Sequence, residues 1–334
     1  DGVTASAVLW EALTLFKAKL SIYLPDRVSE GYGLNKEAIE KIVTSGCRLI
    51  ITVDNGTRSQ EEVIYAKNLG LEVIVTDHHA LPDREEFIPD CLFINCTDPR
   101  QSYPTKNLAG VGVAFKLVQA LLLRSKLDLA TQTQIEKRIF DLVAMGTVSD
   151  MMPLLGENRI LVKQGLVEIN KQKRLGVREL IKVIKSKMEK IDAWTLGFQI
   201  GPRLNAASRL GDASNALSLL LTTDEAEASM LAQELDQKNA SRQEITEKIM
   251  SEVEAQIDPE KLPDIIIGRS LIMEEPWNEG VIGLVAGKIC EKYYRPTLII
   301  TSTGGGFKGF GRSIEEFRLI SAIETCREYL DKYG

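Results

Sequence analysis

The sequence has few cysteines and histidines, and it has no long apolar run. Its five cysteines are scattered, odd in number and never spaced as Cys-x-x-Cys. This pattern argues against a disulfide framework or a zinc knuckle, and it suits a reducing compartment. No stretch approaches the apolar length of a membrane span, and no signal peptide is visible. These absences predict a cytoplasmic protein that does not associate with a membrane.

The length of the chain bears on the number of domains, and its net charge bears on the ligands it can bind. A chain of 334 residues predicts two domains, and 44% hydrophobic with 26% charged residues is ordinary for a globular protein. The net charge of −6 argues mildly against broad nucleic-acid binding, because phosphate contacts need local positive charge. A basic groove on an acidic body is still compatible with this value.

The first half of the chain alternates helical and strand patterns. Such alternation with short turns predicts a parallel sheet covered by helices on both faces. The expected helices are 3–16, 36–45 and 59–69, and the expected strands are 20–24, 48–53, 72–76 and 91–95. Helices then dominate from 112 to about 166, and 178–187 is also helical in pattern.

A long polar stretch at 223–257 contains no glycine or proline and predicts one helix. Its length favours a rod that joins two domains over a surface helix of one domain. After it the expected strands are 264–267 and 296–301, and the expected helices are 280–293 and 319–330. The fold class is therefore α/β: a parallel-sheet domain at 1–190, a linking helical segment at 191–257 and a smaller α/β domain at 258–334.

The only two histidines, His78 and His79, follow Asp77 at the end of an apolar run. The run is typical of a buried parallel strand, and in open α/β sheets ligands bind beyond the carboxyl ends of strands. One interpretation is a solvated histidine pair in a turn. The other, which three further aspartate-bearing segments favour, is a metal site.

Those segments carry Asp54, Asp150 and Asp1. Asp54 ends the preceding strand, and a βαβ unit places consecutive strands close together, so Asp54 and His78 are expected to face one site. Taken singly, Asp54 could cap a turn, Asp150 could cap a loop and Asp1 could be frayed. Three carboxylates with one imidazole suit Mn²⁺ or Mg²⁺ and phosphoryl chemistry.

Several motifs resemble those of the DHH phosphoesterases. These are Asp54-Asn55-Gly56, Asp77-His78-His79 and the segment 146–150, and Asp1-Gly2 is similar to the end of the family's first motif. Segments 30–34, 109–117, 201–207 with Arg209, and 277–283 narrow the resemblance to the RecJ single-strand exonucleases. Asn278 stands where family members usually have His. The resemblance covers nearly the whole chain and implies a core fragment. By this resemblance, the fragment would lack the earlier aspartates of the first motif and an OB-fold. Its second domain, which is DHHA1-like, would be truncated at the C-terminus.

The resemblance implies a metal-dependent 5′ to 3′ exonuclease that hydrolyses phosphodiester bonds of single-stranded DNA in repair and recombination. Two ions, Mn²⁺ or Mg²⁺, would be held by Asp1, His78 and Asp150, with Asp54 as the bridging ligand. Asp54 and His79 are the catalytic candidates, and His79 is expected to contact the scissile phosphate or to orient a ligand. A monomer is expected, with a single-strand-binding protein and a helicase as partners.

The substrate side is expected to use donors from both domains. The glycine-rich segment 304–313 carries Lys308 and Arg312 and predicts an anion nest with phenylalanines for base stacking, or alternatively a plain glycine hairpin. The resemblance places further residues against the strand, with nucleic acid in a cleft between the domains. The expected nucleic-acid contacts are Arg27, Tyr32, Arg203, Asn205, Arg209, Lys308 and Arg312.

Two other functions stay open. One is a DHH phosphodiesterase for short oligonucleotides or cyclic dinucleotides, although such proteins usually lack the 277–283 pattern and the long helix. The other is a replication scaffold with a decayed site. The presence of Asp54, His78, His79 and Asp150 argues against the scaffold.

Overall fold

The chain forms two compact units that divide inside one long helix. The computed structural model describes residues 1–25, 30, 33–82, 84–184, 190–270 and 275–331. By contacts, the units are Asp1–Gln237 and Lys238–Gly334. The boundary lies within helix α11 (Glu225–Glu254), so the expected long helix is present. Residues 191–237 pack within the first unit, and the domain limits at 190 and 257 stay a prediction.

The first unit contains a three-stranded parallel sheet in the order β1-β2-β3. The strands are β1 (Leu49–Val53), β2 (Glu72–Asp77) and β3 (Leu92–Asn95). Val53 lies opposite Thr76, and Asp77 lies opposite Asn95. The carboxyl ends of all three strands therefore meet at one edge, as the sequence predicted.

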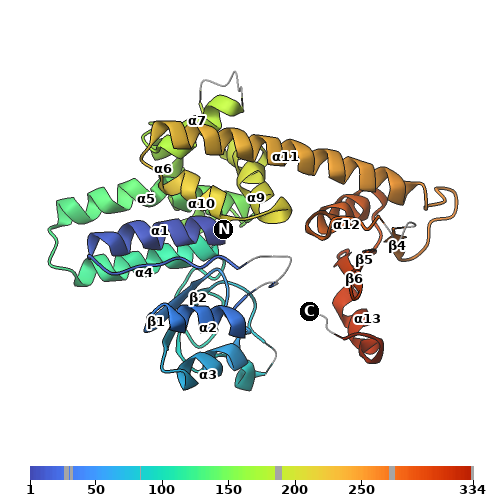
Figure 1. Cartoon of the computed structure of the whole chain (residues 1–334), viewed down its shortest axis with the longest axis horizontal. Helices are drawn as coiled ribbons and strands as arrows, with labels where there is room; N and C mark the ends of the chain where they lie inside the picture. Colours follow the sequence, from blue (N-terminus) through green and yellow to red (C-terminus); the bar gives the residue numbers. More distant parts are fainter. Residues whose placement is uncertain (26–29, 31–32, 83, 185–189, 271–274, 332–334) are drawn as a thin grey trace. The chain divides into compact units, whose positions relative to one another are not determined.

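Helices cover both faces of this sheet (Figure 1). On one face Val73 and Val75 of β2 pack with Ile39 and Val63 of two short helices, while Ile51 of β1 packs on the opposite face. Successive side chains of a strand point to opposite faces, so β1 and β3 each contribute to both hydrophobic cores. The flanking helices are α2 (Lys36–Thr44) and α3 (Gln60–Asn68) on one side, and α1 (Gly2–Leu15) and α4 (Gly110–Arg124) on the other.

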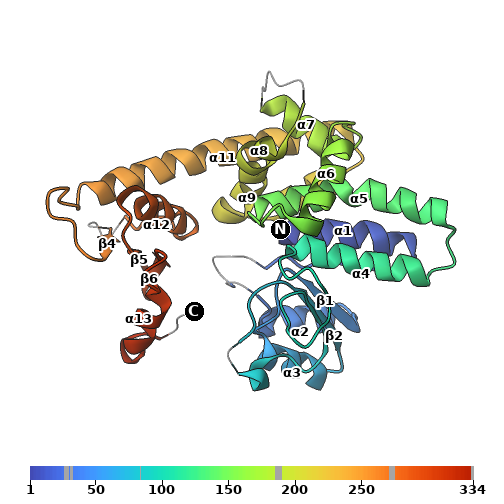
Figure 2. The ribbon, with the colours of Figure 1, turned by 180° about the vertical axis from the view of Figure 1, so that it is seen from behind.

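A helical layer packs on α1 and α4 and completes the first unit (Figure 2). Its helices are α5 (Leu129–Ser149), α6 (Gly156–Ile169), α7 (Leu175–Val183), α8 (Ala193–Thr195), the π-helical turn η2 (Leu196–Ile200), α9 (Gly201–Leu210) and α10 (Ser214–Leu221). With α4, its first helices confirm the helical character expected from 112 to about 166, and α7 confirms the helix expected from 178 as far as the structure describes it, because residues 185–187 lie outside the described residues. A short 3₁₀ turn, η1 (Glu85–Phe87), lies before β3.

The strand expected at 20–24 is wrong. Residues 20–24 have no strand partner in the part of the chain that the structure describes. Ile22 and Leu24 still pack against the core, which explains the alternating pattern. Tyr23 instead donates its hydroxyl hydrogen bond to Glu30 at 2.7 Å, so side-chain contacts hold this segment as an irregular connection.

Arg174, at the start of α7, joins three helices from a buried position. Its Nε donates to Asp141 Oδ2 of α5 at 2.6 Å, and its Nη1 donates to the Leu220 carbonyl of α10 at 2.8 Å. The same guanidinium pairs with Glu11 of α1. Asp141 therefore relies on Arg174 to compensate its buried charge, while Glu11 also pairs with Arg138 at 2.9 Å.

Arg174→Ala should destabilise the first unit strongly. Removing one partner of a buried ion pair leaves uncompensated charge, which typically costs about 3–5 kcal/mol of unfolding free energy. Urea unfolding followed by circular dichroism measures this loss. Arg84→Ala is the matched control, because Arg84 pairs with Glu86, both side chains are exposed, and removing the pair should change stability little. Equal stability of Arg174→Ala and wild type would contradict the role of Arg174.

The second unit has a mixed sheet in the order β4-β5-β6. Its strands are β4 (Ile266–Arg269), β5 (Thr297–Thr303) and β6 (Gly306–Arg312), and its helical elements are α12 (Glu279–Tyr293), α13 (Leu319–Thr325) and the 3₁₀ turn η3 (Arg327–Tyr329). β4 and β5 pair in parallel, β5 and β6 pair antiparallel, and α12 packs on β5 and β6. The predicted helix at 319–330 is therefore shorter than expected.

Candidate metal centre

Asp54 is held in a left-handed backbone conformation just beyond β1. Its φ is +57°, a region that Asp and Asn adopt more readily than most residues. Its N–H donates to the Thr76 carbonyl at 3.1 Å. Thr52 Oγ1 donates to the Asn55 carbonyl at 2.8 Å, and Gly56 at φ +108° completes the turn. This turn fixes the Asp54 carboxylate at the edge where the strands end.

Asp1 is held by the amino end of α4. The Gly110 N–H donates to Asp1 Oδ2 at 2.5 Å, and the Val111 N–H donates to Asp1 Oδ1 at 2.8 Å. Free N–H groups and the helix dipole at a helix start favour a carboxylate in this position. The Asp1 side chain is only 2% exposed, so the amides orient a buried, charged group.

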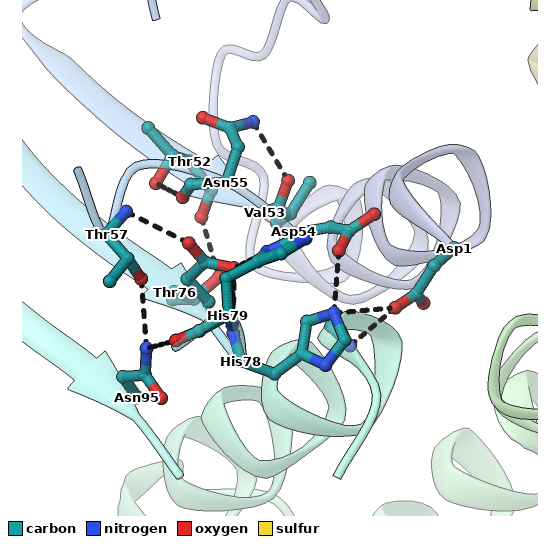
Figure 3. A network of polar contacts seen from close by, with 12 residues as sticks. Asp1, Thr52, Val53, Asp54, Asn55, Thr57, Thr76, His78, His79 and Asn95 are labelled. Carbon is teal, nitrogen blue, oxygen red and sulfur yellow. Dashed lines mark hydrogen bonds and ion pairs between the residues drawn. The ribbon is translucent and has the colours of Figure 1, made fainter. Parts of the chain in front are cut away.

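His78 lies among three carboxylates. Its Nε2 is 3.1 Å from Asp54 Oδ1, 3.7 Å from Asp1 Oδ2 and 3.6 Å from Asp150 Oδ2. Figure 3 shows the His78 ring between Asp54 and Asp1. Asp150 follows the last turn of α5, where its N–H donates to the Gly146 carbonyl at 2.9 Å. The structure thus brings together the four residues that the sequence suggested as metal ligands.

The electrostatics of this cluster favour a bound cation. Burial raises the pKa of Asp150, the charge of His78 opposes that shift, and the neighbouring Asp54 reinforces it. Ligand atoms of Asp1, His78 and Asp150 lie within 4.8 Å of one another, and so do those of Asp54, Asp77, His78 and His79. Carboxylate oxygens with imidazole nitrogen suit hard to borderline divalent ions, so the residues present fit Mn²⁺ or Mg²⁺.

Asp77 and Asn95 support the centre, although the sequence suggested no role for either. The buried Asp77 accepts hydrogen bonds from His79 Nδ1 at 2.7 Å and from the Thr57 N–H at 2.9 Å. Burial opposes its ionisation, but these bonds outweigh burial and lower the pKa of Asp77. Asn95 Nδ2 donates to the His79 carbonyl at 2.9 Å. The sequence could have suggested both residues, because Asp77 and Asn95 are the last residues of β2 and β3.

Asp77→Asn should lower the pKa of His79. The Asp77 hydrogen bond is the main cause that raises the pKa of the His79 imidazole, while burial lowers it, so removing the carboxylate moves the His79 titration to lower pH. Because the chain has only two histidines, NMR of the imidazole protons in metal-free protein can follow each ring. Asp90→Asn, at an exposed carboxylate paired with Lys67, is the control and should leave the titration unchanged. An unshifted His79 in Asp77→Asn would contradict the assignment.

Comparison with known proteins agrees with this geometry. Residues 1–147 match the family model described as the N-terminal domain of the DHH family. A manganese-bound crystal structure of exonuclease RecJ is 34% identical, superposes with a TM-score of 0.83, and covers 99% of this chain and 80% of its own. The chain belongs to the RecJ family.

Further RecJ relatives match along the whole chain. The single-stranded-DNA-specific exonuclease RecJ of Bacillus subtilis strain 168 is 39% identical over 337 residues, covering 100% of this chain and 41% of the relative. RecJ of Thermus thermophilus in complex with Mn²⁺ is 33% identical, with a TM-score of 0.84, and covers 100% of this chain and 46% of its own. The chain spans about half the length of the curated relatives it matches. The same Thermus protein has also been solved with Mg²⁺.

The structure describes three of the five residues of the first unit that were expected to contact the substrate. Arg203 is paired with Asp236 of α11 at 2.7 Å and donates to the Gln199 carbonyl at 2.8 Å. Asn205 lies two residues further along α9, and Arg209 lies in its last turn. Arg27 and Tyr32 lie outside the described residues.

In the second unit the glycine-rich segment forms a hairpin. β5 and β6 pair from Thr297–Arg312 to Thr303–Gly306, so residues 304 and 305 make the turn. Lys308 of β6 forms an ion pair with Glu279 at 2.8 Å. Arg312 is exposed, and no ion pair with it is found among the described residues. The backbone of this segment is therefore a β-hairpin, and phosphate contacts of Lys308 and Arg312 stay a prediction.

Trp277 and Asn278 are structural in this unit. Trp277 is 6% exposed, and its Nε1 donates to Glu252 Oε2 at 2.7 Å. Asn278 caps α12 by accepting the Gly280 N–H at 2.9 Å.

Across the described residues, every helix is too short or too polar to cross a membrane.

Proposed function

We propose that this RecJ-family chain is the catalytic core of a single-stranded-DNA-specific exonuclease. It hydrolyses phosphodiester bonds from the 5′ end with Mn²⁺ or Mg²⁺, in DNA repair and recombination. The observation that carries the proposal is the convergence of three aspartates on His78 Nε2, from residues far apart in the sequence. The likeness to metal-bound RecJ structures along the whole chain supports it.

In this proposal Asp1, Asp54, His78 and Asp150 would hold two divalent ions, and Asp54 would serve both. Bound ions would polarise the phosphoryl oxygens and lower the pKa of an attacking water. The α4 amides keep Asp1 oriented, and the turn after β1 keeps Asp54 at the strand edge. These hydrogen bonds fix the orientation of both carboxylates, and groups held in this way need little reorganisation during a reaction.

His79 is proposed to contact the scissile phosphate. Its Nδ1 hydrogen-bonds with Asp77, which fixes the ring and raises the pKa of the imidazole. A protonated ring carries a positive charge and leaves Nε2 as a second donor for a phosphate oxygen. Asp77 is thus a positioning residue that acts through His79.

Seven residues are proposed to contact the nucleic acid, on the family resemblance: Arg27, Tyr32, Arg203, Asn205, Arg209, Lys308 and Arg312. The existing ion pairs of Arg203 with Asp236 and of Lys308 with Glu279 compete with phosphate. We therefore expect the exposed Arg312 to contribute more to affinity and to its salt dependence than Lys308 does.

The remaining proposals concern the cellular compartment, oligomeric state and partners of the protein. We propose a cytoplasmic monomer that works with a single-strand-binding protein and a helicase. All five cysteines are free thiols, which is compatible with a reducing compartment. A phosphodiesterase for short oligonucleotides or cyclic dinucleotides is less well supported, because the likeness to RecJ extends through both units. A decayed scaffold is less well supported, because Asp54, His78, His79 and Asp150 are present and lie in groups that could hold a metal ion.

The test compares single strands carrying a 5′ or a 3′ label with a blunt duplex, in Mn²⁺, Mg²⁺ or a chelator. We expect metal-dependent loss of nucleotides from the 5′ end of the single strand, and a resistant duplex. Equal cleavage of the duplex would contradict strand specificity, and release from the 3′ end would contradict the polarity. Cleavage that persists in the chelator would contradict the metal-dependent reaction.

A further inference from the structure

Trp194 and Phe198 form a stacked aromatic pair on the surface of the first unit. Their ring centroids are 5.6 Å apart and their planes differ by 27°. Trp194 is 54% exposed and Phe198 is 67% exposed. Large aromatic side chains usually contribute their area to a core, and the metal chemistry proposed above uses neither residue.

The pair is carried by helical turns that pack on the end of α5, the helix that leads into Asp150. Trp194 belongs to α8 and Phe198 to the π-helical turn η2. A Cβ atom added to Gly197 would lie 3.4 Å from Val148 Cγ1, and one added to Gly201 would lie 2.5 Å from Ser149 Oγ. The backbone on either side of Phe198 is therefore in close contact with the last residues before Asp150.

The geometry turns the aromatic face away from this packing. Gly197 and Phe198 are neighbours in the same helical turn, so their Cα atoms face different directions around its axis. Gly197 of η2 and Gly201 of α9 lie against the end of α5, while Trp194 and Phe198 are exposed to solvent. In Figures 1 and 2, α9, which continues directly from η2, lies next to the N-terminus, where Asp1 is located. π-helical turns are rare and frequently accompany functional sites.

We propose that Trp194 and Phe198 are a stacking platform for bases of a single-stranded nucleic acid whose backbone is being cleaved at the metal centre. The inference rests on the proposed function and extends it by naming a base-binding subsite in the first unit. Aromatic faces bind every base through its π-face, so they tolerate any sequence and select unpaired bases. Continuity with the end of α5, and hence with Asp150, favours a strand as the occupant over a protein partner.

Tryptophan fluorescence tests the contact directly. Trp277 is buried and Trp10 is partly buried, so Trp194 is the exposed member of the three tryptophans. Metal-free chain is titrated with oligothymidylate and, as a control, with an abasic strand of equal length. We expect quenching by oligothymidylate, no quenching by the abasic strand, and loss of the quench in Trp194→Phe while binding persists. Absence of quenching by oligothymidylate would overturn the proposal.

Affinity measurements separate stacking from charge. Trp194→Ala and Phe198→Ala should each weaken oligothymidylate binding about 5- to 100-fold, the range of base–aromatic stacking. The slope of affinity against salt should not change, because no phosphate contact is lost. Leu123→Ala, at an apolar residue of α4 that is 78% exposed, is the matched control and should bind normally. Unchanged affinity in both aromatic variants would overturn the platform.

The two proposals fail in different ways. If wild-type chain shows no metal-dependent cleavage of a single strand, the proposed function fails, and the subsite fails with it. If wild type cleaves normally but neither quenching nor the affinity losses are seen, the platform alone fails. A variant with weaker binding and a normal affinity for Mn²⁺, measured by calorimetry, supports the platform and excludes an indirect effect through Asp150.

Discussion

Asp54→Asn should abolish metal-dependent cleavage of single-stranded DNA while leaving the fold intact. Asp54 Oδ1 is 3.1 Å from His78 Nε2, and Asp54 is the proposed shared ligand of both ions. Metal ions supply several kcal/mol of transition-state stabilisation, so losing them should slow cleavage by about 1000-fold or more. Asparagine is the right replacement because it tolerates the φ of +57° at this position, which alanine adopts poorly.

The measurement is the single-turnover rate of 5′-labelled strand at saturating Mn²⁺, beside thermal unfolding of the same preparation. Asp90→Asn removes an exposed carboxylate paired with Lys67 and should cleave at the wild-type rate. Calorimetric titration with Mn²⁺ should show weaker binding or fewer ions in Asp54→Asn only. A variant that is folded and still cleaves within about tenfold of wild type would show that Asp54 is not a metal ligand.

Part of this centre could be predicted from the sequence because parallel strands leave a clear signal. Buried on both faces, they appear as short apolar runs, and their carboxyl ends share one edge of the sheet. The residues just beyond β1 and β2 were therefore expected to meet, and the structure brings Asp54 and His78 to 3.1 Å. The parallel sheet was predicted from the alternation of helical and strand patterns, and the long helix from its length without glycine or proline. Few other structures have either pattern.

Other features depend on contacts that no local pattern contains. The segment 20–24 alternates like a strand, but a strand also needs a neighbour, and none of the described residues pairs with it. Lysine and arginine in a glycine-rich or Gly-Pro segment suggest phosphate contacts, yet Lys308 and Arg203 pair with Glu279 and Asp236. Partner carboxylates from other helices cannot be recognised before the fold is known.

The pair of backbone N–H groups that bind the Asp1 carboxylate is a second contact between residues far apart in the sequence. The donors are the N–H groups of Gly110 and Val111, more than a hundred residues along the chain. The sequence showed a glycine-containing helix start there, without showing which carboxylate it would meet. That contact, together with the close approach of Asp54, makes Gly110 a sensitive position for metal binding.

Gly110→Ala should weaken metal binding and cleavage together, without changing any ligand. A Cβ atom at this position would lie 2.7 Å from Asp54 Cβ and 2.9 Å from both its Cα and its Oδ1. Either the turn after β1 or the start of α4 must shift, and the shift displaces Asp54 or the amide that holds Asp1. Disturbing groups that orient metal ligands typically costs about 10–100-fold in metal affinity or activity, and we expect a loss of this size.

Gly112→Ala provides a matched control two residues further along the same helix. Its added Cβ atom would meet only Leu108 side-chain atoms, at 3.4 Å and beyond, which is ordinary van der Waals contact. Alanine is the better helix former, so this variant should be as stable as wild type or slightly more stable, with unchanged Mn²⁺ affinity. Calorimetric Mn²⁺ titration and thermal unfolding of both variants separate loss of site geometry from loss of fold. If Gly110→Ala binds Mn²⁺ as tightly as Gly112→Ala does, then the contact between the start of α4 and Asp54 does not shape the metal centre.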